Sequence, residues 1–147
     1  MNLHPYYSSL AASFHYLALA IGLGALFMRG RYLRQGNLSN LFIADNFWGI
    51  AALLWIITGS LRAFGGLEKG TAYYLYQPLF WVKMGLFVLL LVCELKPMIT
   101  FIGWRIQAKK RQELSTRQLK LLILLNDFET ALVVIIPFVA SAMAHNL

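Results

Sequence analysis

Apolar residues are arranged along the chain in four long runs, and the stretches between them hold most of the charged and turn-forming residues. Each run is close to the ~20 residues that an α-helix needs to cross the hydrocarbon core of a bilayer. The pattern therefore predicts four membrane-spanning helices, at about 8–28, 44–64, 79–102 and 119–143. Because short connections join them, we expect an all-α integral membrane four-helix bundle with up-down topology, forming one transmembrane domain over 1–147.

The composition agrees with a chain surrounded by lipid. Apolar residues make up 59% of the sequence and charged residues 13%, with a mean hydropathy of +0.62. A disordered chain has low hydrophobicity and high charge, so this class is excluded. A soluble domain has about a quarter charged residues, and the composition fits that class poorly. Cys93 is the single cysteine, which excludes an intramolecular disulfide framework and any multi-cysteine metal site.

The net charge of +7 is unevenly distributed. The segment before the first run and the tail after the fourth carry no Lys or Arg, and the region after the second run carries Arg62 and Lys69. The connection after the first run carries Arg29, Arg31 and Arg34. The connection after the third run carries Lys96, Arg105, Lys109, Lys110, Arg111 and Arg117.

Short loops rich in Lys and Arg remain on the cytoplasmic side of a membrane. This rule predicts a multi-pass membrane protein in which both termini and the 65–78 loop lie outside. Topology alone accounts for the basic connections, so we expect the lipid bilayer as a partner and no nucleic acid.

Polar side chains within the runs should face the bundle interior, because hydrocarbon is a costly environment for them. The first run places small residues and two basic ones on one helical stripe, at spacings of three and four, which favours close helix packing. This stripe consists of Ala11, His15, Ala18, Gly22, Ala25 and Arg29.

The other runs predict corresponding faces. In the second run the predicted face holds Asp45, Gly49, Ala52 and Gly59, with Arg62 near it. In the third it holds Lys83, Phe87, Leu90 and Glu94. In the fourth it holds Asn126, Glu129, Val133 and Pro137. The four faces converge in a polar-lined interior.

Two of these residues have the chemistry of metal ligands. A neutral His15 imidazole can ligate haem iron through one ring nitrogen, and a buried Lys83 that loses its proton offers an amine lone pair. Both are expected in the outer half of the membrane, and Arg62 near the outer surface suits a propionate. The alternative is that His15 hydrogen-bonds across helices while Lys83 extends to the interface.

The carboxylates admit two interpretations. Asp45, Glu94 and Glu129 could mark a proton path, because ionisable groups inside membranes often do. Alternatively, Asp45 and Glu94 form ion pairs with Arg29, Arg31 or Lys96 near the inner face. Glu129 is expected close to the midplane.

Short motifs carry a family resemblance over about 15–130. The chain has Phe14-His15-Tyr16, then Gly22, Gly24, Phe27 and Arg29, then Asp45 and Gly59, and then Trp81-Val82-Lys83. This pattern resembles the HemJ-type protoporphyrinogen IX oxidases. It is closer to a related group of four-helix bacterial membrane proteins defined by a domain of unknown function, which shares a similar run with Glu94-Leu95, Pro97 and Trp104-Arg105.

The resemblance implies a location in a bacterial inner membrane and haem b as the cofactor, with His15 and Lys83 as its ligands. The chain departs from the oxidase pattern at two places. Glu94 stands where those oxidases have histidines near the end of the third helix, and Asn126-Asp127-Phe128-Glu129 stands where their fourth helix carries Asn-Glu-x-Pro. These departures concern the substrate site more than the haem site.

Three functions remain open. The first is a haem b-binding redox protein with a porphyrin ligand, with Lys83 and Glu129 as catalytic candidates and His15, Lys83 and Arg62 holding the cofactor. The second is a non-enzymatic structural or accessory subunit, as a homo-oligomer or in a larger membrane complex. The third is a small oligomeric transporter or ion-pathway protein that uses Glu129.

Overall fold

The computed structural model describes residues 4–66, 71–112 and 117–145, and all regular secondary structure in these ranges is helical. Lys69, which the sequence analysis assigned to an outer loop, lies outside these residues. The helices are α1 (His4–Gln35), α2 (Leu38–Phe64), α3 (Thr71–Tyr76), α4 (Pro78–Lys109) and α5 (Leu119–Ala144).

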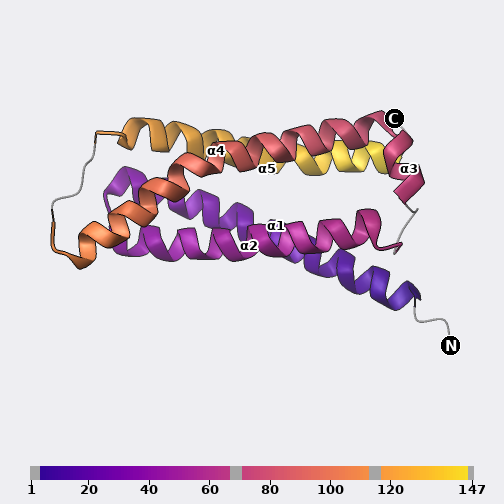
Figure 1. Ribbon diagram of the computed structural model, residues 1–147, viewed down its shortest axis with the longest axis horizontal. Helices are drawn as coiled ribbons and strands as arrows, with labels where there is room; N and C mark the ends of the chain where they lie inside the picture. Colours follow the sequence, from indigo (N-terminus) through magenta and orange to yellow (C-terminus); the bar gives the residue numbers. More distant parts are fainter. Residues whose placement is uncertain (1–3, 67–70, 113–116, 146–147) are drawn as a thin grey trace.

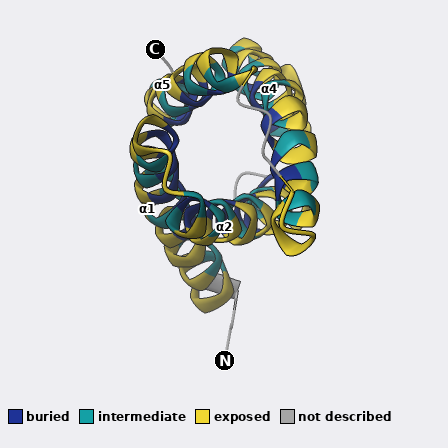
Figure 2. Ribbon diagram, turned by 90° about the vertical axis from the view of Figure 1, so that its left-hand side faces the viewer, coloured by how far each residue is buried: buried dark blue, intermediate teal, exposed yellow. Residues whose placement is uncertain are grey.

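The four long helices run antiparallel in an up-down bundle (Figure 1). Both termini lie at one end, which we call the terminal end, and the connections α1–α2 and α4–α5 lie at the other, which we call the loop end. Seen along the bundle axis, the helices form a ring in the order α1, α2, α4, α5, with buried residues facing inward and exposed ones outward (Figure 2). The short helix α3 lies at the terminal end, beside the start of α4.

Each long helix is long and apolar enough to cross a membrane. The helices extend beyond the predicted spans, mainly at the loop end: α1 continues to Gln35 and α4 to Lys109. Helix α1 ends because Gly36 adopts a φ of +66°, a conformation that is favourable for glycine alone. Asn37 then begins α2, and its side chain accepts a hydrogen bond from the Asn40 amide. The turn between the two helices is therefore only two residues long.

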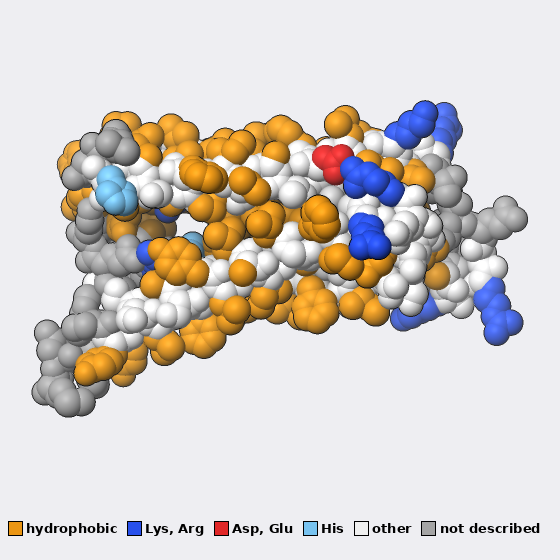
Figure 3. Space-filling view, turned by 180° about the vertical axis from the view of Figure 1, so that it is seen from behind, with side chains coloured by type: hydrophobic (Ala, Val, Ile, Leu, Met, Phe, Trp, Pro, Cys, Tyr) orange, Lys and Arg blue, Asp and Glu red, His pale blue; other side chains and the backbone are white. Residues whose placement is uncertain are grey.

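The outer surface is apolar around the middle of the bundle, and Lys and Arg side chains gather at the loop end (Figure 3). Large hydrophobic residues remain exposed on every long helix, among them Phe27, Phe47, Val92 and Phe138. In water such a surface would be unfavourable, but in a bilayer it is what lipid tails contact. The helical fold class is confirmed, and a long apolar helix is found at each of the four predicted spans.

The predicted interior faces are confirmed for α1, α4 and α5, and the one for α2 is confirmed in part: Asp45 contacts Arg29 and Gly59 packs against His15, whereas Gly49 is exposed, with open space around it. Each helical residue is rotated by about 100° from the previous one, and the centre of the observed face is shifted by one position. The buried residues of its central part are Ala44, Trp48, Ala51, Trp55 and Thr58.

The shift has a packing reason. Large indoles fill the interior, and small residues of α1 make room for them: a Cβ added at Gly22 would lie 3.2 Å from the Trp48 ring. Gly22 of α1 therefore accommodates a large side chain of α2 as well as the small Ala51.

Candidate functional site

A cavity of ≈ 560 Å³ lies at the terminal end of the bundle and is lined by residues from all five helices. Its volume is within the range of about 300–1,000 Å³ that small-molecule sites occupy. His15, Arg62 and Lys83 all line it, so the structure brings together the three residues that were predicted to hold a cofactor. Figure 3 shows this end hollowed between apolar side chains, with basic and histidine side chains visible inside.

His15 is held by two hydrogen bonds to α2. The Trp55 indole N–H donates to Nε2 over 2.9 Å, and Nδ1 lies 2.9 Å from the Thr58 hydroxyl. An indole nitrogen can only donate, so Nε2 accepts and Nδ1 carries the hydrogen of the neutral ring. Thr58 accepts that hydrogen and donates its own to the Leu54 carbonyl over 2.6 Å. The imidazole is therefore fixed in one tautomer.

Close packing and aromatic rings complete this part of the cavity wall. A Cβ at Gly59 would lie 3.3 Å from His15 Cε1, so glycine allows the imidazole to approach α2. Phe87 meets Trp55 edge to face, with ring centroids 5.7 Å apart. These rigid aromatic contacts hold the polar side chains of the cavity wall in position.

The two cationic side chains of the cavity lie over aromatic rings. The Arg62 guanidinium is 5.5 Å from the Tyr16 ring centroid, and Lys83 Nζ is 5.5 Å from the Phe80 ring centroid. Among the described lining residues none is acidic. The cavity thus combines apolar walls with an imidazole from α1, a guanidinium from α2 and an amine from α4, a set that suits an amphipathic ligand with an anionic part.

The His15 imidazole and the Lys83 amine are compatible with haem under one condition. Iron in a porphyrin needs only axial ligands from the protein, and imidazole and amine are both suitable. The Nε2 lone pair of His15, however, accepts the Trp55 hydrogen bond, so the indole must move before that nitrogen can bind iron. Within the described residues there is no cluster of three or more His, Cys, Asp or Glu that would hold a bare metal ion.

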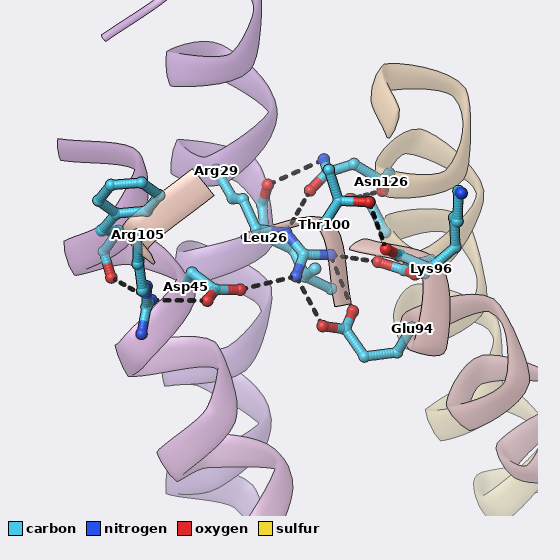
Figure 4. A network of polar contacts seen from close by, with 11 residues as sticks. Leu26, Arg29, Asp45, Glu94, Lys96, Thr100, Arg105 and Asn126 are labelled. Carbon is cyan, nitrogen blue, oxygen red and sulfur yellow. Dashed lines mark hydrogen bonds and ion pairs between the residues drawn. The ribbon is translucent and has the colours of Figure 1, made fainter. Parts of the chain in front are cut away.

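A second polar site lies toward the loop end, where Arg29 is completely buried (Figure 4). Nε donates to Asn126 Oδ1 over 2.7 Å. Nη1 and Nη2 donate to the two oxygens of Glu94, each over 3.0 Å. Nη1 also lies 3.3 Å from Asp45 Oδ1, and Nη2 donates to Glu129 Oε2. The guanidinium therefore binds three carboxylates and one amide from three other helices.

Further contacts extend this network. Arg105 donates to the other oxygen of Asp45 over 2.8 Å and to the Phe42 carbonyl over 3.2 Å. Asn126 donates to the Leu26 carbonyl over 3.1 Å. The network thus connects all four long helices, as buried charges require when they are kept out of water.

The structure changes the predicted role of Arg29 and refines those of the carboxylates. Arg29 was counted in the cytoplasmic connection and also placed on the inward stripe of the first run; it lies inside α1 with no exposed surface, as the stripe predicted. The predicted pairing of Asp45 and Glu94 with Arg29 is confirmed. Glu129 joins the same network and does not line the cavity, so it is separated from Lys83, the other catalytic candidate.

Trp55, Thr58 and His145 were missed by the sequence analysis. His145 lines the cavity, and its Nδ1 lies 2.9 Å from the Ser141 carbonyl. A signal for the first two was present: Trp48, Ala51, Trp55 and Thr58 follow spacings of three, four and three, which mark a helical face.

These features define the class: a helical membrane protein with four helices able to cross a bilayer and with two polar sites in its interior. The chain belongs to the DUF2214 family of predicted membrane proteins, whose family model matches residues 7–146. No curated protein and no solved structure matches it significantly. The family match includes every residue of both sites.

Proposed function

We propose that the protein binds haem b in the cavity at the terminal end and acts as a redox protein of a bacterial inner membrane, related to the HemJ-type oxidases. One observation carries this proposal: an imidazole, an amine and a guanidinium from three helices converge on one apolar cavity. An amphipathic porphyrin matches this arrangement, because its ring is apolar and its propionates are anionic.

Each residue has a definite part in this proposal. His15 would ligate iron through Nε2 once Trp55 moves, while the Nδ1 hydrogen bond to Thr58 keeps the ring oriented. Lys83 would be the second ligand and Arg62 would bind a propionate with its planar guanidinium. Bound haem supplies one-electron chemistry, with a potential that depends on its ligands and its burial.

The first test is an absorption spectrum of protein purified after expression with ample haem. We expect a Soret band that is lost in His15→Ala and is altered in Lys83→Met. His145→Ala is the matched control, because that histidine lines the same cavity and has no ligand role in the proposal. A pigment-free wild-type protein, or equal losses in both histidine variants, would contradict haem ligation by His15.

Trp55→Phe tests the condition that the structure imposes. Removing the indole N–H frees Nε2 of His15, so haem should bind more tightly by roughly 2- to 10-fold, the equivalent of one neutral hydrogen bond. Haem titration of the two proteins measures the difference. Weaker binding in the variant would show that Nε2 is not the ligand.

Oxidation of a porphyrinogen is the more specific form of the proposal, and it requires an electron acceptor supplied with the substrate. In this form Lys83 would contact the substrate and not the iron, whereas Glu129 lies outside the cavity. The appearance of porphyrin fluorescence in the presence of purified protein, and its loss in Lys83→Met, tests this activity.

A second candidate is a structural or accessory membrane subunit without enzymatic activity. It is favoured by the fact that both ring nitrogens of His15 are already hydrogen-bonded within the chain. Co-purification of a stoichiometric partner, or of a second copy of the chain, with His15 and Lys83 both dispensable, would support this candidate over the first.

A further inference from the structure

The network around Arg29 contains an unequal number of opposite charges. Two arginines, Arg29 and Arg105, face three carboxylates, Asp45, Glu94 and Glu129. With every group ionised, the cluster would hold one net negative charge. An uncompensated charge inside a membrane protein is costly, and a group in that situation takes up a proton instead.

Of the three carboxylates, Glu129 accepts the fewest hydrogen bonds that would stabilise a negative charge. Its side chain is completely buried, and among the described residues Oε1 has no hydrogen-bond partner. Oε2 accepts from Arg29 Nη2. A buried carboxylate oxygen without a donor loses its hydration and gains nothing in return, whereas a protonated carboxyl is neutral and has a hydrogen to donate.

Glu94 provides the neighbour for that hydrogen. Its Oε2 accepts from the same Arg29 Nη2 that Glu129 binds, so oxygens of the two carboxyl groups lie side by side. Like charges at one site disfavour double ionisation and favour a shared proton. Glu94 is also partly exposed, at 17% of its side chain, whereas Glu129 is at 0%. Glu94 is therefore the member through which a proton reaches Glu129.

The ionisable groups next to the network do not balance its charge. On α4 the thiol of Cys93 lies within electrostatic reach of Glu129, and the Lys96 side chain is exposed. On α5 the adjacent Asp127 faces outward, half-exposed, and forms its ion pair with Arg34.

We infer that this network is a proton-binding site, in which Glu94 and Glu129 together hold one exchangeable proton beside Arg29. Uptake of that proton makes the cluster neutral, and its release leaves one negative charge. The site is separate from the cavity and does not depend on haem.

Infrared spectroscopy of the protein in lipid bilayers tests the inference. We expect the C=O stretching band of one protonated carboxyl group per chain at neutral pH, shifted in D₂O. Glu129→Gln and Glu94→Gln should each abolish the band, because either change leaves two carboxylates for two arginines. Asp127→Asn removes an exposed carboxylate from α5, the helix that carries Glu129, and should leave the band unchanged.

Wild-type protein without such a band at neutral pH would overturn the inference, whether or not the variants fold. A band that persists in both glutamine variants, or that disappears in Asp127→Asn, would also overturn it. If one glutamine variant does not fold, loss or persistence of the band in the other still decides.

Discussion

The two halves of the bundle use polar residues in opposite ways. Toward the loop end, Arg29 is enclosed by carboxylates and an amide, and its partners all belong to the chain. At the terminal end, basic side chains surround a cavity of ≈ 560 Å³. The same four helices therefore form a self-contained ionic core in one half and an open binding space in the other.

The comparison indicates that residues important for stability and residues important for ligand binding lie in different halves of the bundle. A buried ion pair that loses one partner leaves an unpaired charge, which is strongly destabilising. Polar groups that line a cavity can exchange a protein partner for water or a ligand at much lower cost. Substitutions in the loop half should therefore affect folding, and those in the terminal half mainly binding.

The largest effect is expected for Arg29→Met. It leaves three carboxylates near the bundle interior without their common cation, and the free energy of unfolding should fall by about 3–5 kcal/mol. Chemical or thermal unfolding in detergent measures it. Arg34→Met is the control, because its ion pair with Asp127 is about half exposed and should contribute at most about 1 kcal/mol. Similar losses in both variants would contradict the special position of Arg29.

Gly30→Ala should have the next largest effect. The new Cβ would lie 2.5 Å from Asn126 Nδ2, and Asn126 cannot move freely because it is bonded to Arg29 and to the Leu26 carbonyl. Overpacking of this kind costs about 1–3 kcal/mol. At Gly24 a Cβ meets nothing within 4 Å, so Gly24→Ala should leave the unfolding free energy unchanged or slightly raise it. A larger loss of unfolding free energy in Gly24→Ala than in Gly30→Ala would argue against the geometry of the network.

Thr58→Val tests the terminal half. It removes the acceptor of the His15 Nδ1 hydrogen, and we expect a loss of about 1 kcal/mol, because water in the adjoining cavity can replace the hydroxyl. Thr100→Val is the matched control, since among the described residues the Thr100 hydroxyl bonds only to the Lys96 carbonyl of its own helix. A loss as large as that of Arg29→Met would show that the two halves are equally rigid.

Cysteine labelling should distinguish the two halves by the accessibility of introduced thiols, with no difference in the free energy of unfolding required. In a Cys93→Ala background, Ala140→Cys lies on the cavity wall and should react with a maleimide. Ala18→Cys, at a position 1% exposed in the central core, should remain unreacted until the protein unfolds. Equal reaction rates at both positions would contradict an open terminal cavity.

Much of the fold could be predicted because lipid imposes a simple rule on sequence. Apolar runs of membrane length identified all four long helices, and the polar positions within three of them identified the interior faces. The face of α2 was found only in part, through Asp45 and Gly59. The rule that small residues mark helix contacts selected Gly49, whereas the interior is filled by the indoles of Trp48 and Trp55.

The network was harder to predict than the cavity. His15, Arg62 and Lys83 are isolated polar residues within apolar runs, so their inward position follows from hydrophobicity alone. Arg29 lies at the end of such a run, where an arginine is also typical of a cytoplasmic connection. Its partners are between 16 and 100 residues away along the chain, and no local pattern specifies such a separation.

The two-residue turn at Gly36 has a consequence for assembly. It joins α1 and α2 into a hairpin that already contains both Arg29 and Asp45, so the arginine can enter the bilayer as one half of an ion pair. Glu94, Glu129 and Asn126 belong to the other hairpin, α4–α5. Only one alignment of the two hairpins brings these groups to the arginine, and a slipped or rotated pair would leave them facing hydrocarbon. The buried Arg29 side chain thus sets the register in which the two apolar hairpins pack against each other.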